Sequence, residues 1–200
     1  MFQDLAKRLF EAKPLKETLR SKPHEHIHKI RLFHGEILDH EDCDALVSFV
    51  TPDLSLGGPL NKAYLAKAGE ELGDYIAERI VQPKAGEAFV VPAFNMPNKA
   101  VILAVLPLWE DGLQNEDRQM LRCYRHSIQK AQGKGIQSVA FPALGFGRLN
   151  FPHIRFARFA IKGILESIDE SMQEVRIVCR DKTMSDIYAT HLRKLGWSPS

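Results

Sequence analysis

The feature that most constrains the fold is a short apolar run early in the chain, Ala45-Leu-Val-Ser-Phe-Val50. A strand with one solvated face alternates apolar and polar residues, whereas a strand buried on both faces is apolar almost throughout. The run therefore predicts a central strand of a sheet that is covered by other structure on both sides.

The rest of the chain alternates strand-like runs with segments whose apolar residues recur at helical spacing. We expect strands over residues 27–33, 45–50, 89–91, 100–106, 136–141 and 175–179, and helices over 60–80, 116–131, 151–167 and 184–195. Gly69 is expected to break the first of these helices. Such alternation predicts one α/β domain, a mostly parallel sheet between two helix layers.

The start of the chain predicts an extension outside this domain. Residues 1–26 are expected to form an amphipathic helical extension and residues 27–200 the domain. The extension would either pack on the domain or bind a protein partner through residues 1–22. Its mixed charge is unlike a signal peptide, and no apolar run approaches the ~20 residues of a transmembrane helix, so we expect a cytoplasmic protein without membrane contact.

Charge and cysteine content argue against several other classes. A net charge of +2 gives no indication of nucleic-acid binding. Cys43, Cys123 and Cys179 are odd in number and far apart, which argues against a disulfide framework and a cysteine zinc site. The histidines of the segment 24–28 would share one face of a strand and could converge on a metal. That segment offers no neighbouring residues to orient the histidines around a metal, so we favour a solvated segment that leads into a strand. We expect neither metal nor cofactor.

Two glycine-rich segments, residues 51–59 and 143–150, follow strands and precede helices. In α/β sheets the ligand site lies at such loops. Glycine lets a ligand approach bare backbone N–H groups, and a helix N-terminus favours anions, so each segment is suited to phosphate. Two neighbouring cradles indicate two linked phosphates. Neither segment matches the G-x-x-x-x-G-K-[ST] or G-x-G-x-x-G pattern, which argues against a nucleoside triphosphatase or a nicotinamide oxidoreductase.

The order of several motifs resembles that of the macro domain family, the ADP-ribose-binding modules. Gly35-Glu36-Ile37 stands for the family's G-D-I, and Asp44-Ala-Leu-Val47 for its D-A-I-V strand. Residues 48–60 are similar to N-A-A-N-x-x-L-x-x-G-G-G-V, and residues 136–152 to I-x-S-I-A-F-P-A-I-S-T-G-x-Y-x-Y-P. The resemblance covers about residues 30–190 and implies a three-layer α/β/α fold with a mixed, mostly parallel central sheet.

The resemblance also implies which residues contact the nucleotide. Glu36 would accept a hydrogen bond from the adenine amino group, with Ile37 beside the base, and Arg180 would stack on it where relatives place an aromatic ring. Gly57 and Gly58 would hold one end of the diphosphate and the distal ribose. The second segment would supply the remaining contacts, mostly through backbone N–H groups: Leu144, Gly145, Phe146, Gly147, Arg148 and Leu149.

Departures from the family pattern bear on catalysis. Ser48 and Thr51 replace the two asparagines, and Asn61 stands where hydrolytic members carry an acidic residue. Asp53 lies in the same loop, where it is either a base or a turn residue. We therefore expect a divergent module that binds ADP-ribose or an ADP-ribosylated macromolecule with little hydrolysis.

Two alternatives stay open. One is an enzyme that removes ADP-ribose or processes O-acetyl-ADP-ribose or ADP-ribose-1″-phosphate, with Thr51, Asp53 or Asn61 as candidates. The other is an interaction scaffold without a nucleotide. Away from the glycine-rich segments, we assign Trp109 and Phe156 to the core, and Arg155 and Arg158 to a solvated helix face.

Overall fold

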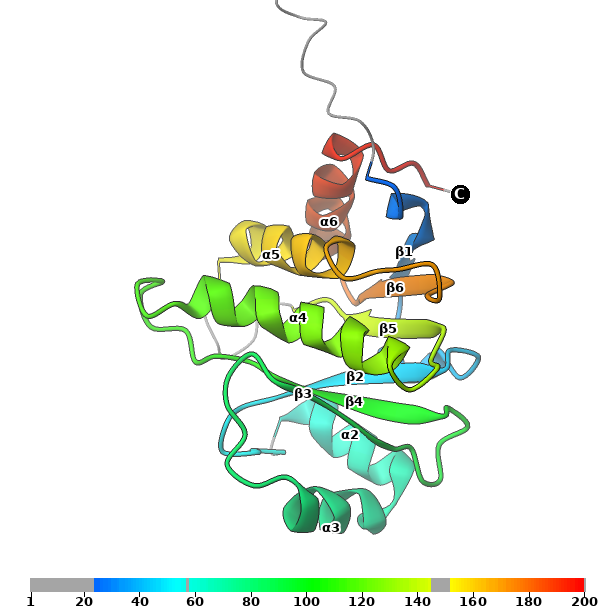
Figure 1. The fold of residues 1–200 in the computed structure, drawn as a ribbon, viewed down its shortest axis with the longest axis vertical. Coiled ribbons are helices and arrows are strands. Elements are labelled where there is room, and N and C mark those ends of the chain that lie inside the picture. The colour runs from blue at the N-terminus through cyan, green and yellow to red at the C-terminus, as the bar shows by residue number, and fades with distance from the viewer. Residues whose placement is uncertain (1–23, 57, 145–151, 200) are drawn as a thin grey trace, which may run out of the picture.

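The structure is a computed structural model that describes residues 24–56, 58–144 and 152–199 (Figure 1). Within them, six strands form one sheet in the order β1-β6-β5-β2-β4-β3. The strands are β1 (Ile30–His34), β2 (Ala45–Val50), β3 (Ala88–Pro92), β4 (Ala100–Val105), β5 (Ser138–Pro142) and β6 (Glu174–Cys179). All neighbours pair in parallel except β3, which is antiparallel to β4. This confirms the mixed, mostly parallel sheet.

Helices cover both faces of the sheet, with α4, α5 and α6 on one side and α2 and α3 on the other (Figure 1). Their bounds are α2 (Pro59–Ala68), α3 (Glu70–Arg79), α4 (Glu116–Gln132), α5 (His153–Leu165) and α6 (Lys182–Lys194). Two short 3₁₀ turns, η1 (Ile27–Lys29) and η2 (Ile37–Asp39), flank β1. The three-layer arrangement agrees with the prediction.

Strand β2 occupies the centre, and all six of its residues are buried. Val47 and Phe49 point into the core beneath α4, α5 and α6, while Leu46 and Val50 point into the core beneath α2 and α3. The unbroken apolar run therefore arises because each face of this strand meets a different helix layer.

The predicted helix over residues 60–80 is broken at Gly69, as expected. Gly69 has φ of 96°, and a Cβ there would lie 2.6 Å from the Asn95 side-chain nitrogen. A residue with a side chain would be strained in that conformation and would also collide. The break therefore separates α2 from α3 at a position that requires glycine.

The first strand starts later than expected. Residues 27–29 form η1 because Ile27 and Lys29 donate backbone hydrogen bonds to residues three positions earlier, and pairing with β6 begins only at Ile30. The expectation of a strand from residue 27 is therefore wrong. His28 lies in η1, whereas His24 and His26 precede it in a turn, so the three side chains do not follow one strand and the premise of a shared strand face fails.

The three cysteines are free and buried. Cys43 belongs to the core beneath α2 and α3, whereas Cys123 and Cys179 belong to the core beneath α4, α5 and α6. Burial raises the pKa of Cys179 to about 12. Across residues 24–56, 58–144 and 152–199, no helix has the length and apolar character needed to cross a membrane.

Candidate functional site

The parallel strands bring the predicted ligand contacts to one edge of the sheet. Glu36 follows β1, Gly58 follows β2, Leu144 follows β5 and Arg180 follows β6. These four strands are consecutive neighbours in the sheet, so the loops at their carboxyl ends lie side by side. Ile37 lies beside Glu36, and the remaining predicted contacts fall outside the described residues: Gly57, Gly145, Phe146, Gly147, Arg148 and Leu149.

Glu36 and Arg180 form an ion pair across the ends of β1 and β6. Gly35, with φ of 144°, donates its N–H to the carbonyl of Cys179 at 3.0 Å and then turns the chain so that Glu36 caps η2. Arg180 Nε donates to Glu36 Oε1 at 2.8 Å. The Arg180 and Glu36 side chains remain 71% and 53% exposed. A carboxylate has room for about four hydrogen bonds, so Glu36 can accept another while it binds Arg180.

Ile37 contributes differently from the neighbouring Glu36. Its side chain is only 3% exposed and packs in the core beneath α2 and α3. A ligand at this edge would therefore meet the backbone of Ile37 rather than its side chain.

Gly58 precedes α2 in a conformation that does not need glycine. Its φ of −71° and ψ of 155° suit any residue, and a Cβ at this position would meet none of the described residues within 4 Å. Turn geometry and packing therefore both fail to explain the glycine. Open space beside the first N–H groups of a helix is what an anion requires.

The loop between β2 and α2 is organised around Asp53. The Thr51 hydroxyl donates to Asp53 Oδ1, and the Ser55 N–H donates to the same oxygen at 3.1 Å. The hydrogen bond from Thr51, followed by that from Ser55, lowers the pKa of Asp53. A carboxylate with a lowered pKa is a weaker base, so this geometry favours the turn interpretation.

Asn61 is buried in a hydrogen-bond network. Its Oδ1 accepts from the Ser48 hydroxyl at 2.6 Å, and its Nδ2 donates to the carbonyl of Phe49 at 3.0 Å and more weakly to that of Ser55 at 3.4 Å. The side chain therefore joins α2 to β2 and to the loop between them. Ser48 and Asn61, which the sequence analysis expects to depart from the family pattern, are in direct contact.

The β5 end of the second glycine-rich segment is fixed to the sheet. The Ala143 N–H donates to the Val178 carbonyl at 2.8 Å, which extends the pairing of β5 with β6 beyond Pro142. Leu144 is half-buried and packs against the core beneath α4, α5 and α6. Because part of its side chain packs against the core, we expect a ligand contact to come from its backbone.

Sequence reasoning missed one polar cluster near this edge, at the first turns of α4 and α5. Glu116 is buried, and Asp117 pairs with Arg155, which also lies over the ring of Trp109. Arg155 and Arg158 are both exposed, as the sequence analysis expects, and Arg155 in addition makes these two contacts. The only local signal was an acidic pair at a helix start, which is common at N-termini and does not reveal burial.

Comparison with known proteins gives the family. The model of the macro domain family matches residues 47–160. A macro domain-containing protein of Listeria monocytogenes is 32% identical over 167 residues, which cover 80% of this chain and 94% of that protein. An O-acetyl-ADP-ribose deacetylase of Escherichia fergusonii is 31% identical over 173 residues, covering 84% and 97%.

Solved structures support the same fold. The Trypanosoma brucei macrodomain in complex with ADP-ribose superposes with a TM-score of 0.72 at 21% identity, covering 84% of this chain and 73% of that one. The Oceanobacillus iheyensis macrodomain with ADP gives a TM-score of 0.73 at 22% identity, covering 82% and 90%. With its mixed, mostly parallel sheet, its glycine-rich strand-to-helix segments and these matches, the chain belongs to the macro domain family.

Proposed function

We propose that the protein binds ADP-ribose or a related ADP-ribosyl derivative, free or attached to a macromolecule, and hydrolyses it little. The observation that carries this proposal is the convergence of the loops after β1, β6, β5 and β2 at one edge of the sheet. The structural neighbours from T. brucei and O. iheyensis, in complex with ADP-ribose and with ADP, support the same ligand class.

The adenine end is proposed to lie over Glu36 and Arg180. Both side chains are exposed and held together at 2.8 Å, so a base can reach them without disturbing the core. The carboxylate would accept a hydrogen bond from the exocyclic amino group, and the planar guanidinium would stack on the ring. An oxygen in place of the amino group would face the carboxylate and be repelled.

The diphosphate is proposed to lie between the two glycine-rich segments. Gly58 contributes open space at the start of α2. Gly57 and residues Gly145 to Leu149 remain predictions from the sequence, and Arg148 is proposed as a side-chain partner of a phosphate. This division assigns the base to the side of β1 and β6 and the phosphates to the side of β5 and β2.

Weak hydrolysis is proposed because the candidate catalytic groups already have partners. Asp53 accepts hydrogen bonds from Thr51 and Ser55, and Asn61 is held by Ser48 and the Phe49 carbonyl. A general base must reach the water that it deprotonates. Groups occupied in this way are suited to holding the loop in shape.

Calorimetry with ADP-ribose tests the binding proposal, with Gly58→Val as the key variant. The backbone at Gly58 accepts valine, so the variant should fold while its side chain fills the open space and lowers affinity at least about tenfold. Gly73→Val is the matched control, because Gly73 lies within α3 and, among the described residues, a Cβ there would meet only a Leu65 methyl at 3.6 Å. Absence of ADP-ribose binding by the wild type at millimolar concentration would refute the proposal.

Hydrolysis is the second candidate function, and the name of the E. fergusonii relative favours it. Release of acetate from O-acetyl-ADP-ribose would be measured for the wild type, Thr51→Ala and Asp53→Ala. If the wild type turns over the substrate, and both substitutions abolish turnover while retaining ADP-ribose affinity, the protein is an enzyme and not only a binding module. Turnover near the uncatalysed rate supports the binding module.

A further inference from the structure

The loop between β4 and α4 is wound around a single buried carboxylate. Glu116 is 1% exposed, and its two oxygens accept backbone N–H bonds from Glu110, Gly112 and Gln114 at 3.2, 3.0 and 2.6 Å. Burial alone raises the pKa of Glu116, but these backbone hydrogen bonds outweigh burial and lower the pKa to about 2. The loop therefore has one preferred shape, fixed by an ionised side chain.

This shape positions Trp109 against Arg155. Gly112 has φ of 80°, and a Cβ there would lie 2.7 Å from Trp109 Cη2 and 3.1 Å from Arg155 Nη1. Only glycine allows the loop to approach the ring and the guanidinium this closely. The centre of the guanidinium lies 5.3 Å from the centroid of the Trp109 ring, within the range of a cation–π contact.

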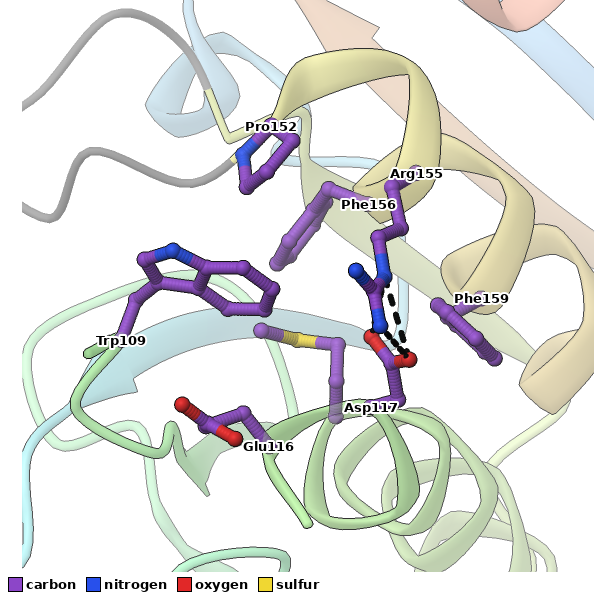
Figure 2. A pocket seen from close by; sticks show the side chains of 8 residues that line it. Trp109, Glu116, Asp117, Pro152, Arg155, Phe156 and Phe159 are labelled. Carbon is purple, nitrogen blue, oxygen red and sulfur yellow. Dashed lines mark hydrogen bonds and ion pairs between the residues drawn. The ribbon is translucent and has the colours of Figure 1, made fainter. Parts of the chain in front are cut away.

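Arg155 also binds Asp117 at the start of α4 through a bidentate ion pair. Its Nε donates to the two carboxylate oxygens of Asp117 at 2.9 and 3.1 Å, and its Nη2 donates to Asp117 as well (Figure 2). Forked contacts of this kind fix orientation as well as distance. Arg155 is the third residue of α5, so the first turn of α5 is attached both to α4 and to the preceding loop.

The pocket drawn in Figure 2 lies at this junction and is too small to be the nucleotide site. Its cavity volume is only about 10 Å³, and it is lined by Trp109, Glu116, Asp117, Met120, Pro152, Arg155, Phe156 and Phe159. Small-molecule pockets usually measure about 300–1,000 Å³. Pro152, which caps α5, forms part of the wall, and its carbonyl accepts from the Phe156 N–H at 2.9 Å. The pocket therefore marks where the start of α5 is secured.

We infer that Arg155 is a positioning residue for phosphate binding, an inference that rests on the proposed function. The second glycine-rich segment runs in sequence from β5 to α5. Its β5 end is fixed by the bond from Ala143 to Val178, and the Arg155 contacts fix the α5 end. A ligand that binds a preformed start of α5 spends less free energy on ordering it. Arg155 acts through the helix and does not touch the ligand.

Arg155→Ala is the variant that tests this inference, with binding measured on the full chain. We expect the affinity for ADP-ribose to fall about tenfold and the affinity for adenosine, followed by NMR titration, to stay within about twofold. Arg155→Lys keeps the charge but loses the fork, so it should recover only part of the affinity. Arg158→Ala is the matched control, because Arg158 is an exposed arginine on the same helix.

The outcomes separate this inference from the proposed function. If the wild type does not bind ADP-ribose, both are overturned. If the wild type binds and Arg155→Ala binds equally well, only the positioning role is overturned. Equal losses for ADP-ribose and adenosine would also overturn it, because they would indicate a general loosening of the domain. Thermal unfolding of each variant confirms that binding is measured well below the melting temperature.

Discussion

Two arginine–carboxylate pairs at the carboxyl edge of the sheet have the same chemistry and different surroundings. Arg180 binds Glu36 with both side chains more than half exposed. Arg155, 44% exposed, binds Asp117 through a fork, lies over the Trp109 ring, and adjoins a loop held by the buried Glu116. An exposed pair contributes little to stability but leaves its polar atoms accessible to a ligand. The same groups become part of the framework when neighbouring residues fix them.

The largest effect is expected at Glu116. Glu116→Ala leaves the N–H groups of Glu110, Gly112 and Gln114 without their acceptor, and we expect the melting temperature to fall on the order of 5 °C or more. Glu36→Ala should change it by about 1 °C or less, because Glu36 is exposed. Thermal unfolding of both variants is the measurement. Equal shifts would erase the contrast between the two regions.

Acid sharpens the same contrast. With a folded-state pKa of about 2, Glu116 contributes stability that is fully present above its unfolded-state pKa, about 4.3, and is lost as the pH falls toward 2. Glu116→Gln has no carboxylate to titrate. The difference in the free energy of unfolding between the wild type and this variant should therefore shrink as the pH falls from about 4.3 toward 2. Urea unfolding at several pH values measures it. A constant difference between pH 5 and pH 2 would contradict the assignment.

Ligand binding should reverse the ranking of the two regions. Glu36→Ala is expected to weaken ADP-ribose binding about tenfold while leaving the fold intact, because the adenine amino group loses its acceptor. Binding of the counterpart that carries hypoxanthine, which has no amino group, should change little. Calorimetry with both ligands measures the ratio. A ratio that the substitution leaves unchanged would show that Glu36 does not recognise the base.

The smallest effect is expected from the Arg180–Glu36 contact itself. A double-mutant cycle with Glu36→Ala and Arg180→Ala should give a coupling energy of unfolding below about 1 kcal/mol, since both side chains are solvated. Raising the salt concentration should reduce it further. A coupling energy that is larger and does not fall with salt would show that the Arg180–Glu36 pair stabilises the fold, as the Arg155–Asp117 pair is expected to.

Much of the fold could be predicted because apolar periodicity records which face of each element is buried. The run over β2 and the break at Gly69 are examples, and both are found in the structure. The start of β1 was missed because Ile27 is buried in either conformation, so the pattern cannot distinguish a strand from a 3₁₀ turn. Whether these residues form a strand or a turn depends on their hydrogen-bond partner, and the partner of β1 is β6, which lies far along the chain.

The site was less predictable for a related reason. Glu36 and Arg180 could each be named from motifs, but their contact joins residues 144 positions apart and depends on β1 pairing with β6. The contact between Ser48 and Asn61 likewise follows from the packing of α2 on β2. Burial of Glu116 has no local signature, because an acidic residue at a helix start is usually solvated.

The three thiols give the molecule an internal reporter of local opening. Cys43 lies beneath α2 and α3, whereas Cys123 and Cys179 lie beneath α4, α5 and α6, and none is more than 1% exposed. An alkylating reagent can reach each one only when the layer above it opens. Comparing the modification rates of Cys43, Cys123 and Cys179 would therefore show how often each helix layer opens, without any added probe.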